Sequence, residues 1–220
     1  MADEEVPYKF MYMAAIQGSD AKVTMEARTS NAPYTYTEDR AIVPFTGDAV
    51  VSYKNKDSYT GHYKESKKCG RGVYCYFASG DKYDGMWKDD RKHGMGTMQY
   101  YCKGKEVEGD EDKPKKEKEY QTYQGYWEND KRHGEGVFTY LNGDTYSGWW
   151  RFGQKEGKGT FTSKASGMRM IGDWEKGEIK RGRWVYPNGF YYEGEFVNNK
   201  PNGQGTWYCK DGNVVKGCFE

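Results

Sequence analysis

The sequence has no long apolar run and almost no excess of charge. No stretch reaches the roughly 18 consecutive apolar residues that a membrane-spanning helix requires. The 34 basic and 33 acidic residues leave a net charge of +1, whereas nucleic-acid-binding proteins carry a basic excess on one face. We therefore expect no nucleic-acid partner and no membrane-spanning segment.

Paired cysteines and a signal peptide are also missing. None of the cysteines stands in a Cys-x-x-Cys pair, and their odd number and scattered positions favour reduced thiols over a zinc site. They are Cys69, Cys75, Cys102, Cys209 and Cys218. The start, "MADEEVPYKFMYMAAIQGSD", is acidic and lacks the basic segment and apolar stretch of a secretory signal. We expect a soluble, cytoplasmic protein without a metal or other cofactor.

Aliphatic residues are scarce as well. The hydrophobic fraction is 35% and the mean hydropathy is −1.10, which leaves few side chains for a thick two-layer core. Disordered chains share this low hydropathy, but they are poor in aromatic residues and usually carry a large net charge. Here the chain contains 29 Gly, 21 Tyr and 7 Trp. We therefore expect an ordered fold that is built on aromatic residues and glycine.

What the chain does contain is a repeat of about 23 residues. The phrase [Tyr/Met/Val]-x-Gly-x-[aromatic] returns at steps of 24, 40, 23, 24, 22 and 23 residues. It starts at Tyr59, Tyr83, Tyr123, Tyr146, Met170, Tyr192 and Val215. Such a period is the signature of a stacked-repeat architecture, and the one long step indicates an insert.

Two further glycine patterns recur within the units. Gly-x-Gly pairs stand at Gly70/Gly72, Gly94/Gly96, Gly134/Gly136, Gly157/Gly159 and Gly203/Gly205. A turn glycine closes most units, at Gly80, Gly143, Gly167, Gly189 and Gly212. The fifth unit departs from the pattern, because Lys180 replaces the first glycine of the pair and Gly182 comes one residue early.

Alternation within the units predicts β-strands. In "YQGYWE" and "GEGVFTY" the aromatic and glycine residues fall on every second position, so they share one face of a strand. Each unit is then a hairpin, with "NDKRHG" at one end and "LNGDT" leading to the next unit. Glycine leaves room for a neighbouring ring against the backbone and lets the sheet bend. The predicted fold class is all-β, with stacked antiparallel hairpins in one elongated, curved single-layer sheet.

This combination of Tyr-x-Gly-x-Trp, Lys/Arg-x-Gly-x-Gly and a turn glycine resembles the MORN repeat (membrane occupation and recognition nexus). The resemblance covers residues 59–220 as six full units and a terminal half unit, and it implies a twisted ribbon of stacked hairpins. A degenerate strand pair precedes it, with Gly47, Ala49, Val51 and Tyr53 on one parity. We therefore predict a MORN-repeat array over residues 46–220.

One strand parity predicts a concave aromatic face, here called the aromatic column. The column consists of Tyr63, Trp87, Trp127, Trp150, Trp174, Phe196 and Phe219. The other parity is mostly polar and is expected to face water, as at Gln124, Glu128, Ser147 and Arg151. A concave aromatic surface suits the binding of a partner helix or extended segment, so the column is the predicted protein-binding site.

A row of cations is predicted along the hairpin tips, here called the basic row. The row consists of Lys68, Lys92, Arg132, Lys155, Lys180 and Lys200. Cations near a membrane surface attract anionic lipid, and the family resemblance implies the same possibility, since MORN repeats have been linked to phospholipids. Acidic residues such as Asp89, Asp130 and Glu156 interleave with the row. The basic row is the alternative site for contact with lipid or with a partner protein. Membrane binding is disfavoured.

Three stretches lie outside the regular pattern. Residues 1–45 are predicted to form an N-terminal cap or a docking arm. The charged insert at about 102–120 is predicted to be a solvated loop, with a partner contact as the alternative. The last strand carries Val215, Gly217 and Phe219, and we expect a partner or a second copy to cover its edge.

No sequence motif indicates catalysis. The residues do not form a Ser/His/Asp, metal-binding or phosphate-loop pattern, and His93 and His133 occupy equivalent positions of the repeat. We therefore expect no enzymatic activity. The role of targeting module for an enzyme, which MORN arrays have in some plant lipid kinases and in a methyltransferase, is disfavoured because no catalytic domain accompanies the repeats.

Within the family, the tail "YYEGEFVNNKPNGQGTWYCKDGNVVKGCFE" is similar to the end of the repeat arrays in radial spoke head MORN proteins of motile cilia. This resemblance implies a structural scaffold of the axoneme, a cytoskeletal location in cilia or flagella, and a contribution to motility. It also implies radial spoke head subunits as partners. The alternatives are a phospholipid-surface adaptor on the basic row and another cytoskeletal MORN adaptor.

Overall fold

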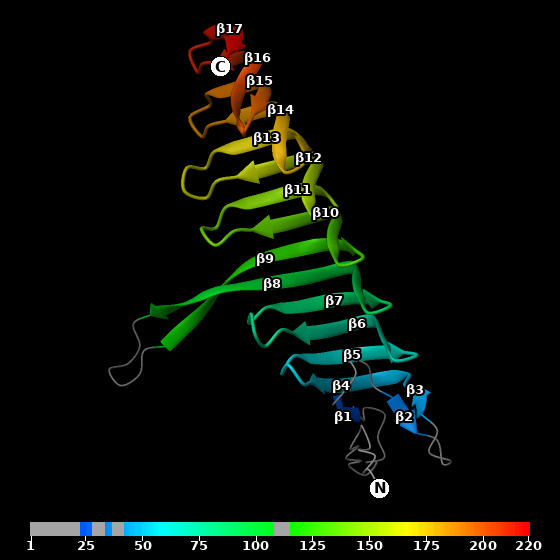
Figure 1. Cartoon of the computed structure of the whole chain (residues 1–220). Helices are drawn as coiled ribbons and strands as arrows, with labels where there is room; N and C mark the ends of the chain where they lie inside the picture. The colour runs from blue at the N-terminus through cyan, green and yellow to red at the C-terminus, as the bar shows by residue number, and fades with distance from the viewer. Residues whose placement is uncertain (1–22, 28–33, 37–41, 108–114) are drawn as a thin grey trace. The chain divides into compact units, whose positions relative to one another are not determined.

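Every regular element of the described residues is a β-strand, which confirms the predicted all-β class (Figure 1). The computed structural model describes residues 23–27, 34–36, 42–107 and 115–220. In chain order the strands are β1 (Val23–Ala27), β2 (Tyr34–Tyr36), β3 (Ile42–Pro44), β4 (Gly47–Tyr53), β5 (Ser58–Lys64), β6 (Lys67–Cys75), β7 (Lys82–Lys88), β8 (Arg91–Val107), β9 (Lys115–Glu128), β10 (Lys131–Thr139), β11 (Thr145–Arg151), β12 (Gln154–Thr162), β13 (Arg169–Glu175), β14 (Glu178–Val185), β15 (Tyr191–Val197), β16 (Lys200–Tyr208) and β17 (Val214–Phe219).

The chain divides into two compact units, Met1–Tyr100 and Tyr101–Glu220. In the first unit the strand order is β1-β4-β5-β6-β7, followed by residues 91–100 of β8. In the second unit the rest of β8 and then β9 to β17 follow one another in chain order. Within each unit, hairpins that are consecutive in the sequence therefore lie side by side, as the colour gradient of Figure 1 shows. Neighbours such as β10 and β11 run antiparallel, so the predicted stack of antiparallel hairpins is confirmed. The domain boundary predicted at residue 45 stays a prediction.

A parallel strand extends the first unit at its N-terminal side. β1 comes from the weakly alternating "AKVTMEA" and pairs with β4, with Val23 opposite Ala49. β4 in turn pairs with β5 and buries Ala49 and Val51, which confirms the degenerate strand before the first full repeat. β2 and β3 form a separate two-stranded sheet. Most of residues 1–41 lie outside the described residues, and a cap or docking role for residues 1–45 stays a prediction.

Two-residue turns close the hairpins at one edge. Asn129 and Asp130 have φ values of 48° and 68°, and Phe152 and Gly153 have values of 50° and 92°. Positive φ at both central residues is the geometry of a type I′ turn, whose twist matches that of the flanking strands. Asn, Asp and Gly tolerate this region best, which explains why tips such as "NDKRHG" recur.

Within the second unit, hydrogen bonds join successive hairpins at the tips and at the opposite turn. At the tips, the Gly153 N–H donates to the Arg132 carbonyl at 2.9 Å and the Gly177 N–H donates to the Lys155 carbonyl at 3.0 Å. At the opposite end, Asp144 Oδ1 accepts a hydrogen bond from the Lys164 N–H of the following loop at 2.8 Å. Because these bonds recur between successive hairpins, they hold those neighbours in a defined register.

The charged insert differs from its expected form. Strand β8 continues to Val107 and β9 begins at Lys115, so the expectation of a loop over about 102–120 is corrected for the described part of the insert. Within the second unit, the Tyr101 and Tyr120 rings at the base of this extension lie 5.8 Å apart. In a strand, the backbone N–H and C=O groups bond to a neighbouring strand, whereas in a solvated loop they bond to water. A partner contact at the insert stays a prediction.

Candidate functional site

In the repeats that begin with tyrosine, the first tyrosine packs against a pair of glycines. Tyr146 is fully buried, and its hydroxyl donates a hydrogen bond to the Trp149 carbonyl at 3.1 Å. Gly148 and Gly159 face each other across two strands, and a Cβ on Gly148 would lie only 2.9 Å from the Tyr146 hydroxyl oxygen. Real Cβ atoms do not approach so closely, so the predicted role of glycine in making room for the rings is confirmed.

These tyrosines connect the rings of the aromatic column. The Tyr146 ring meets Trp150 of its own hairpin at 5.2 Å and Trp174 of the next hairpin at 5.0 Å, both edge to face. Tyr123 makes the same two contacts with Trp127 and Trp150, at 5.2 and 5.3 Å. Edge-to-face pairs of this kind each contribute about 0.5–1.5 kcal/mol beyond burial. Tyrosines thus link the column rings of successive hairpins in one continuous packed array.

The column is buried, and the expectation of an open aromatic surface is corrected. Six of its members are at most 6% exposed: Tyr63, Trp87, Trp127, Trp150, Trp174 and Phe196. Only Phe219, near the end of the array, is partly exposed. The indole N–H groups are also occupied, since Trp150 donates to the Gly136 carbonyl at 3.2 Å and Trp174 donates to the Gly159 carbonyl at 3.1 Å. The column forms the core of the hairpins. Direct contact of a partner with these rings stays a prediction.

Burial of the aromatic rings also changes their acidity. Removal from water raises the pKa of the Tyr53 phenol to about 12, with a smaller opposing effect from its hydrogen bond with Tyr63. The same desolvation raises the pKa of Tyr59 and Tyr146 well above the usual value. These phenols therefore stay neutral throughout the physiological range and act as hydrogen-bond donors.

Most of the basic row faces the molecule's own rings. Each of four cations has aromatic ring centroids within about 6 Å of its charged group: Lys68, Lys92, Arg132 and Lys155. Arg132 lies 4.3 Å from the Trp150 ring and donates to the Gly153 carbonyl at 2.8 Å. The expectation of an exposed row is corrected for these four, because a residue opposite a column ring in the register shares its inward face.

The last two members of the row occupy a different register. Trp150 pairs with Lys155, but Trp174 pairs with Ile179 and Phe196 pairs with Pro201. Lys180 and Lys200 therefore stand one residue away from the inward position, and both are exposed. Lys180 instead pairs with Glu178 at 2.9 Å. The alignment of Lys180 with the other cations is thus corrected, whereas Lys200 is shifted by one residue as its place in the sequence indicates. Apolar residues replace the inward cation in these two hairpins.

The opposite face of the second unit carries aromatic residues that the alternation rule did not single out. Tyr126 and Trp149 are each 50% exposed, beside Val137 at 40% and Ile171 at 37%. They stand at the variable positions of the repeat, where polar residues were expected. The signal was present in the phrase "YQGYWE" and in "YSGWW", since each phrase puts a bulky aromatic residue next to the column tryptophan.

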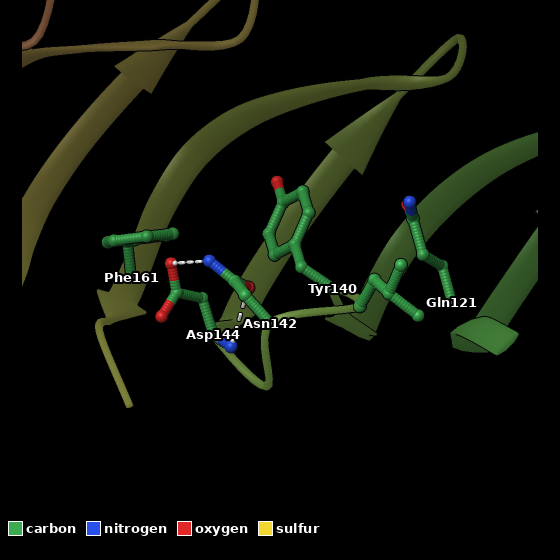
Figure 2. Close-up of a pocket in the computed structure, with 6 residues that line it drawn as sticks. Gln121, Tyr140, Asn142, Asp144 and Phe161 are labelled. Atoms are coloured by element: carbon green, nitrogen blue, oxygen red, sulfur yellow. Dashed lines mark hydrogen bonds between the residues drawn. The ribbon is translucent and has the colours of Figure 1, made fainter. Parts of the chain in front are cut away.

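An open depression of about 520 Å³ lies in the second unit beside the turn between β10 and β11 (Figure 2). Its lining residues are Gln121, Tyr140, Leu141, Asn142, Asp144 and Phe161. The Asp144 carboxylate is already engaged, because it accepts hydrogen bonds from Asn142 Nδ2 at 2.8 Å and from the Lys164 N–H. These bonds order the turn, so the polar groups of the depression serve the hairpin itself.

The described residues offer no group of histidine, cysteine and carboxylate side chains that is able to hold a metal ion. His133 lies at a hairpin tip, 3.3 Å from a Glu128 carboxylate oxygen and with its ring 5.8 Å from that of Phe152. In the same described part, no helix is long and apolar enough to cross a membrane.

Comparison with known proteins places the repeats in a family. The family model described as MORN repeat matches residues 59–81, 83–101, 123–145, 146–168 and 192–214. These matches cover half of the chain, and the chain belongs to the MORN-repeat family, whose repeat is a non-enzymatic, protein-binding scaffold. The unmatched unit that starts at Met170 is the one with the shortened Gly-x-Gly region, yet β13 and β14 still form its hairpin.

No curated protein matches the chain. Among solved structures, the chain is similar to the SAS-4 (dCPAP) TCP domain of Drosophila melanogaster, solved in complex with a proline-rich motif of Ana2 (dSTIL). The sequence identity is 13% and the TM-score is 0.41, over 96% of this chain and 100% of the other.

Proposed function

We propose that this protein is a non-enzymatic scaffold of the radial spoke head in the axoneme of cilia or flagella, where it binds other spoke-head subunits and contributes to motility. The MORN array carries the proposal. Its hairpins are tied to their neighbours at the tips and at the turns, which provides a preorganised surface that binds without a large ordering cost. The resemblance of the tail to radial spoke head arrays, around Lys200-Pro201 and Trp207, supports the specific location.

The position of the cations favours protein binding over lipid binding. Lys155 lies 4.9 and 5.0 Å from the rings of Tyr146 and Trp174, and Lys68 forms an ion pair with Asp90 at 3.2 Å. A cation held against its own rings is not free to approach a lipid headgroup without losing these contacts. The lipid-adaptor alternative is therefore left with Lys180 and Lys200 from the original row.

Tagging of the endogenous protein in a flagellated cell tests the proposal. We expect the tag along the axoneme, and we expect radial spoke head subunits to be recovered with it after extraction of the axoneme. A diffuse cytoplasmic signal or a plasma-membrane signal would contradict the proposal. Flotation with anionic liposomes separates the lipid alternative, which requires the protein to float and requires charge reversal at Lys180 and Lys200 to abolish flotation.

A further inference from the structure

Three residues of the second unit form an exposed cluster on the face opposite the aromatic column. Tyr126 lies on β9, Glu135 on β10 and Trp149 on β11; we call them the aromatic–acidic patch. Tyr126 and Trp149 are each half exposed, whereas their chain neighbours Trp127 and Trp150 are nearly fully buried. Adjacent residues of a strand point to opposite faces, so the patch and the column lie on different sides of the sheet.

The register places Glu135 between the two rings. Glu135 and Trp149 are direct partners in the pairing of β10 with β11. On the other side, the Tyr126 Cβ lies 3.3 Å from the point that a Cβ on Gly134 would occupy, so Tyr126 flanks the same segment of β10. The two aromatic residues are thus separated by two strand spacings, about 10 Å. A carboxylate stands between them.

The other acidic residues of this face have ion-pair partners, and Glu135 differs from them in this respect. Asp173 pairs with Lys158 at 2.7 Å, Glu195 pairs with Arg181 at 3.2 Å, and Glu193 pairs with Arg183 at 3.2 Å. No ion pair or side-chain hydrogen bond involves Glu135 within the described part of the chain. Of the patch and its sheet neighbours, Glu135 is therefore the acidic group whose charge is left for an outside partner.

The buried face of the same unit shows which chemistry this arrangement binds. There the Arg132 guanidinium lies against the rings of Tyr123, Phe138 and Trp150, at 5.7, 5.3 and 4.3 Å. A cation is attracted to aromatic faces, and a carboxylate adds a paired charge with fork geometry that suits arginine best. Tyr126 and Trp149 provide two aromatic rings on either side of the Glu135 carboxylate, and within the described residues no cation of the chain pairs with that carboxylate.

We propose that the aromatic–acidic patch binds an arginine side chain of a partner protein, which inserts between Tyr126 and Trp149 and pairs with Glu135. The inference rests on the proposed function as a protein-binding scaffold and assigns the surface that carries it out. Val137, which is partly exposed on the same strand as Glu135, accepts the apolar neighbour of that arginine. The negative charge of Glu135 disfavours an anionic lipid headgroup at this surface.

An NMR titration of the full-length protein tests the proposal with N-acetyl-arginine amide as the probe. The observed signal is the indole N–H resonance of Trp149, assigned with the Trp149→Phe variant. We expect a saturable shift at millimolar probe that Glu135→Gln weakens at least roughly threefold, in line with an exposed ion pair. The neutral probe N-acetyl-citrulline amide should cause little shift. Glu175→Gln, at an exposed carboxylate beside Lys176, should respond as the wild type does.

Three results would overturn the inference: no shift of Trp149, an equal shift with citrulline, or an unchanged affinity in Glu135→Gln with a normal melting temperature. Broadening of the Trp149 signal with protein concentration in the absence of probe would assign the patch to a second copy instead. The outcome is distinguishable from that of the proposed function. An arginine response without axonemal location contradicts the location alone, whereas axonemal location without an arginine response contradicts the patch alone.

Discussion

Trp149 and Trp150 are adjacent in β11 and have opposite environments. Trp150 is 3% exposed, packs against the rings of Tyr123 and Tyr146, and donates its indole N–H to the Gly136 carbonyl. Trp149 is 50% exposed. At the scale of single residues, one tryptophan therefore stabilises the array and the other belongs to the patch that we assign to binding.

This contrast predicts different effects of the same truncation. Trp150→Ala removes a buried ring and leaves a cavity, so we expect it to lower the free energy of unfolding by about 3–5 kcal/mol. Trp149→Ala removes a half-exposed ring, and we expect a loss below about 1 kcal/mol. Urea denaturation followed by circular dichroism measures both. Equal losses for the two variants would contradict the assignment of core and surface.

Two lysines of successive hairpins, Lys155 on β12 and Lys180 on β14, test the basic row. Lys155 faces the rings of Tyr140, Tyr146, Phe161 and Trp174, so Lys155→Gln should lower stability by about 0.5–2 kcal/mol through loss of cation–π attraction. Lys180 has an exposed ion pair, and its change to Gln should cost less than about 0.5 kcal/mol. Thermal unfolding of both variants measures the difference. A larger loss at Lys180 would contradict the register described for the fifth hairpin.

At the scale of the hairpin, most hairpins are stabilised by a tyrosine over two glycines and by ring contacts with the next hairpin. Tyr146 illustrates this, since it touches Trp150 within its own hairpin and Trp174 in the next. Because the phenol is removed from water, its pKa is higher in the folded state than in the unfolded state. Stability of the array is thereby linked to pH in the alkaline range.

The sign of this linkage follows from the raised pKa. Below pH about 10 the phenol is protonated in both states, so its contribution is fully present. As the pH rises further, the unfolded state loses the proton first, and stability falls by up to about 1.4 kcal/mol per pH unit for one such group. Tyr146→Phe removes that group, so its melting temperature should fall less steeply above pH about 10 than that of the wild type. Identical slopes would contradict the burial of the Tyr146 hydroxyl.

The strands and the role of glycine were predictable because both depend on local pattern. The period-2 alternation around Tyr123 and Gly125 decides which side chains share a face, and the observed register agrees. Alternation does not decide whether a face is open. The column was expected to be accessible, but Trp150 and its equivalents are covered by tyrosines and cations of adjacent hairpins, which are contacts between units and not within one.

A shift of one residue in the strand register near a hairpin tip was equally hard to predict from the sequence. Lys180 was aligned with Lys155, yet the pairing of Trp174 with Ile179 moves the lysine to the outer side. Because side chains alternate along a strand, a shift of one position exchanges the two faces. The same rule hid Tyr126 and Trp149, since their positions were judged by the polar residues that occupy them in other units.

At the scale of the whole molecule, the array separates stability from binding. The core of the hairpins consists of rings and glycines, with an inward cation in four of them. The opposite face is free to vary from hairpin to hairpin. In the second unit that face carries ion pairs such as Lys158 with Asp173 and the patch of Tyr126, Glu135 and Trp149. A repeat scaffold of this kind can present a specific partner site without disturbing its fold.

The most direct test of the central claim is the retention of tagged protein in detergent-extracted axonemes of a flagellated cell. We predict that the wild-type protein stays with the axoneme, as does the Lys180→Gln control. The double variant Glu135→Gln/Trp149→Ala should be released although its melting temperature stays within a few degrees of that of the wild type. Wild-type protein in the detergent-soluble fraction would contradict the account of an axonemal scaffold, and full retention of the double variant would contradict binding through the aromatic–acidic patch.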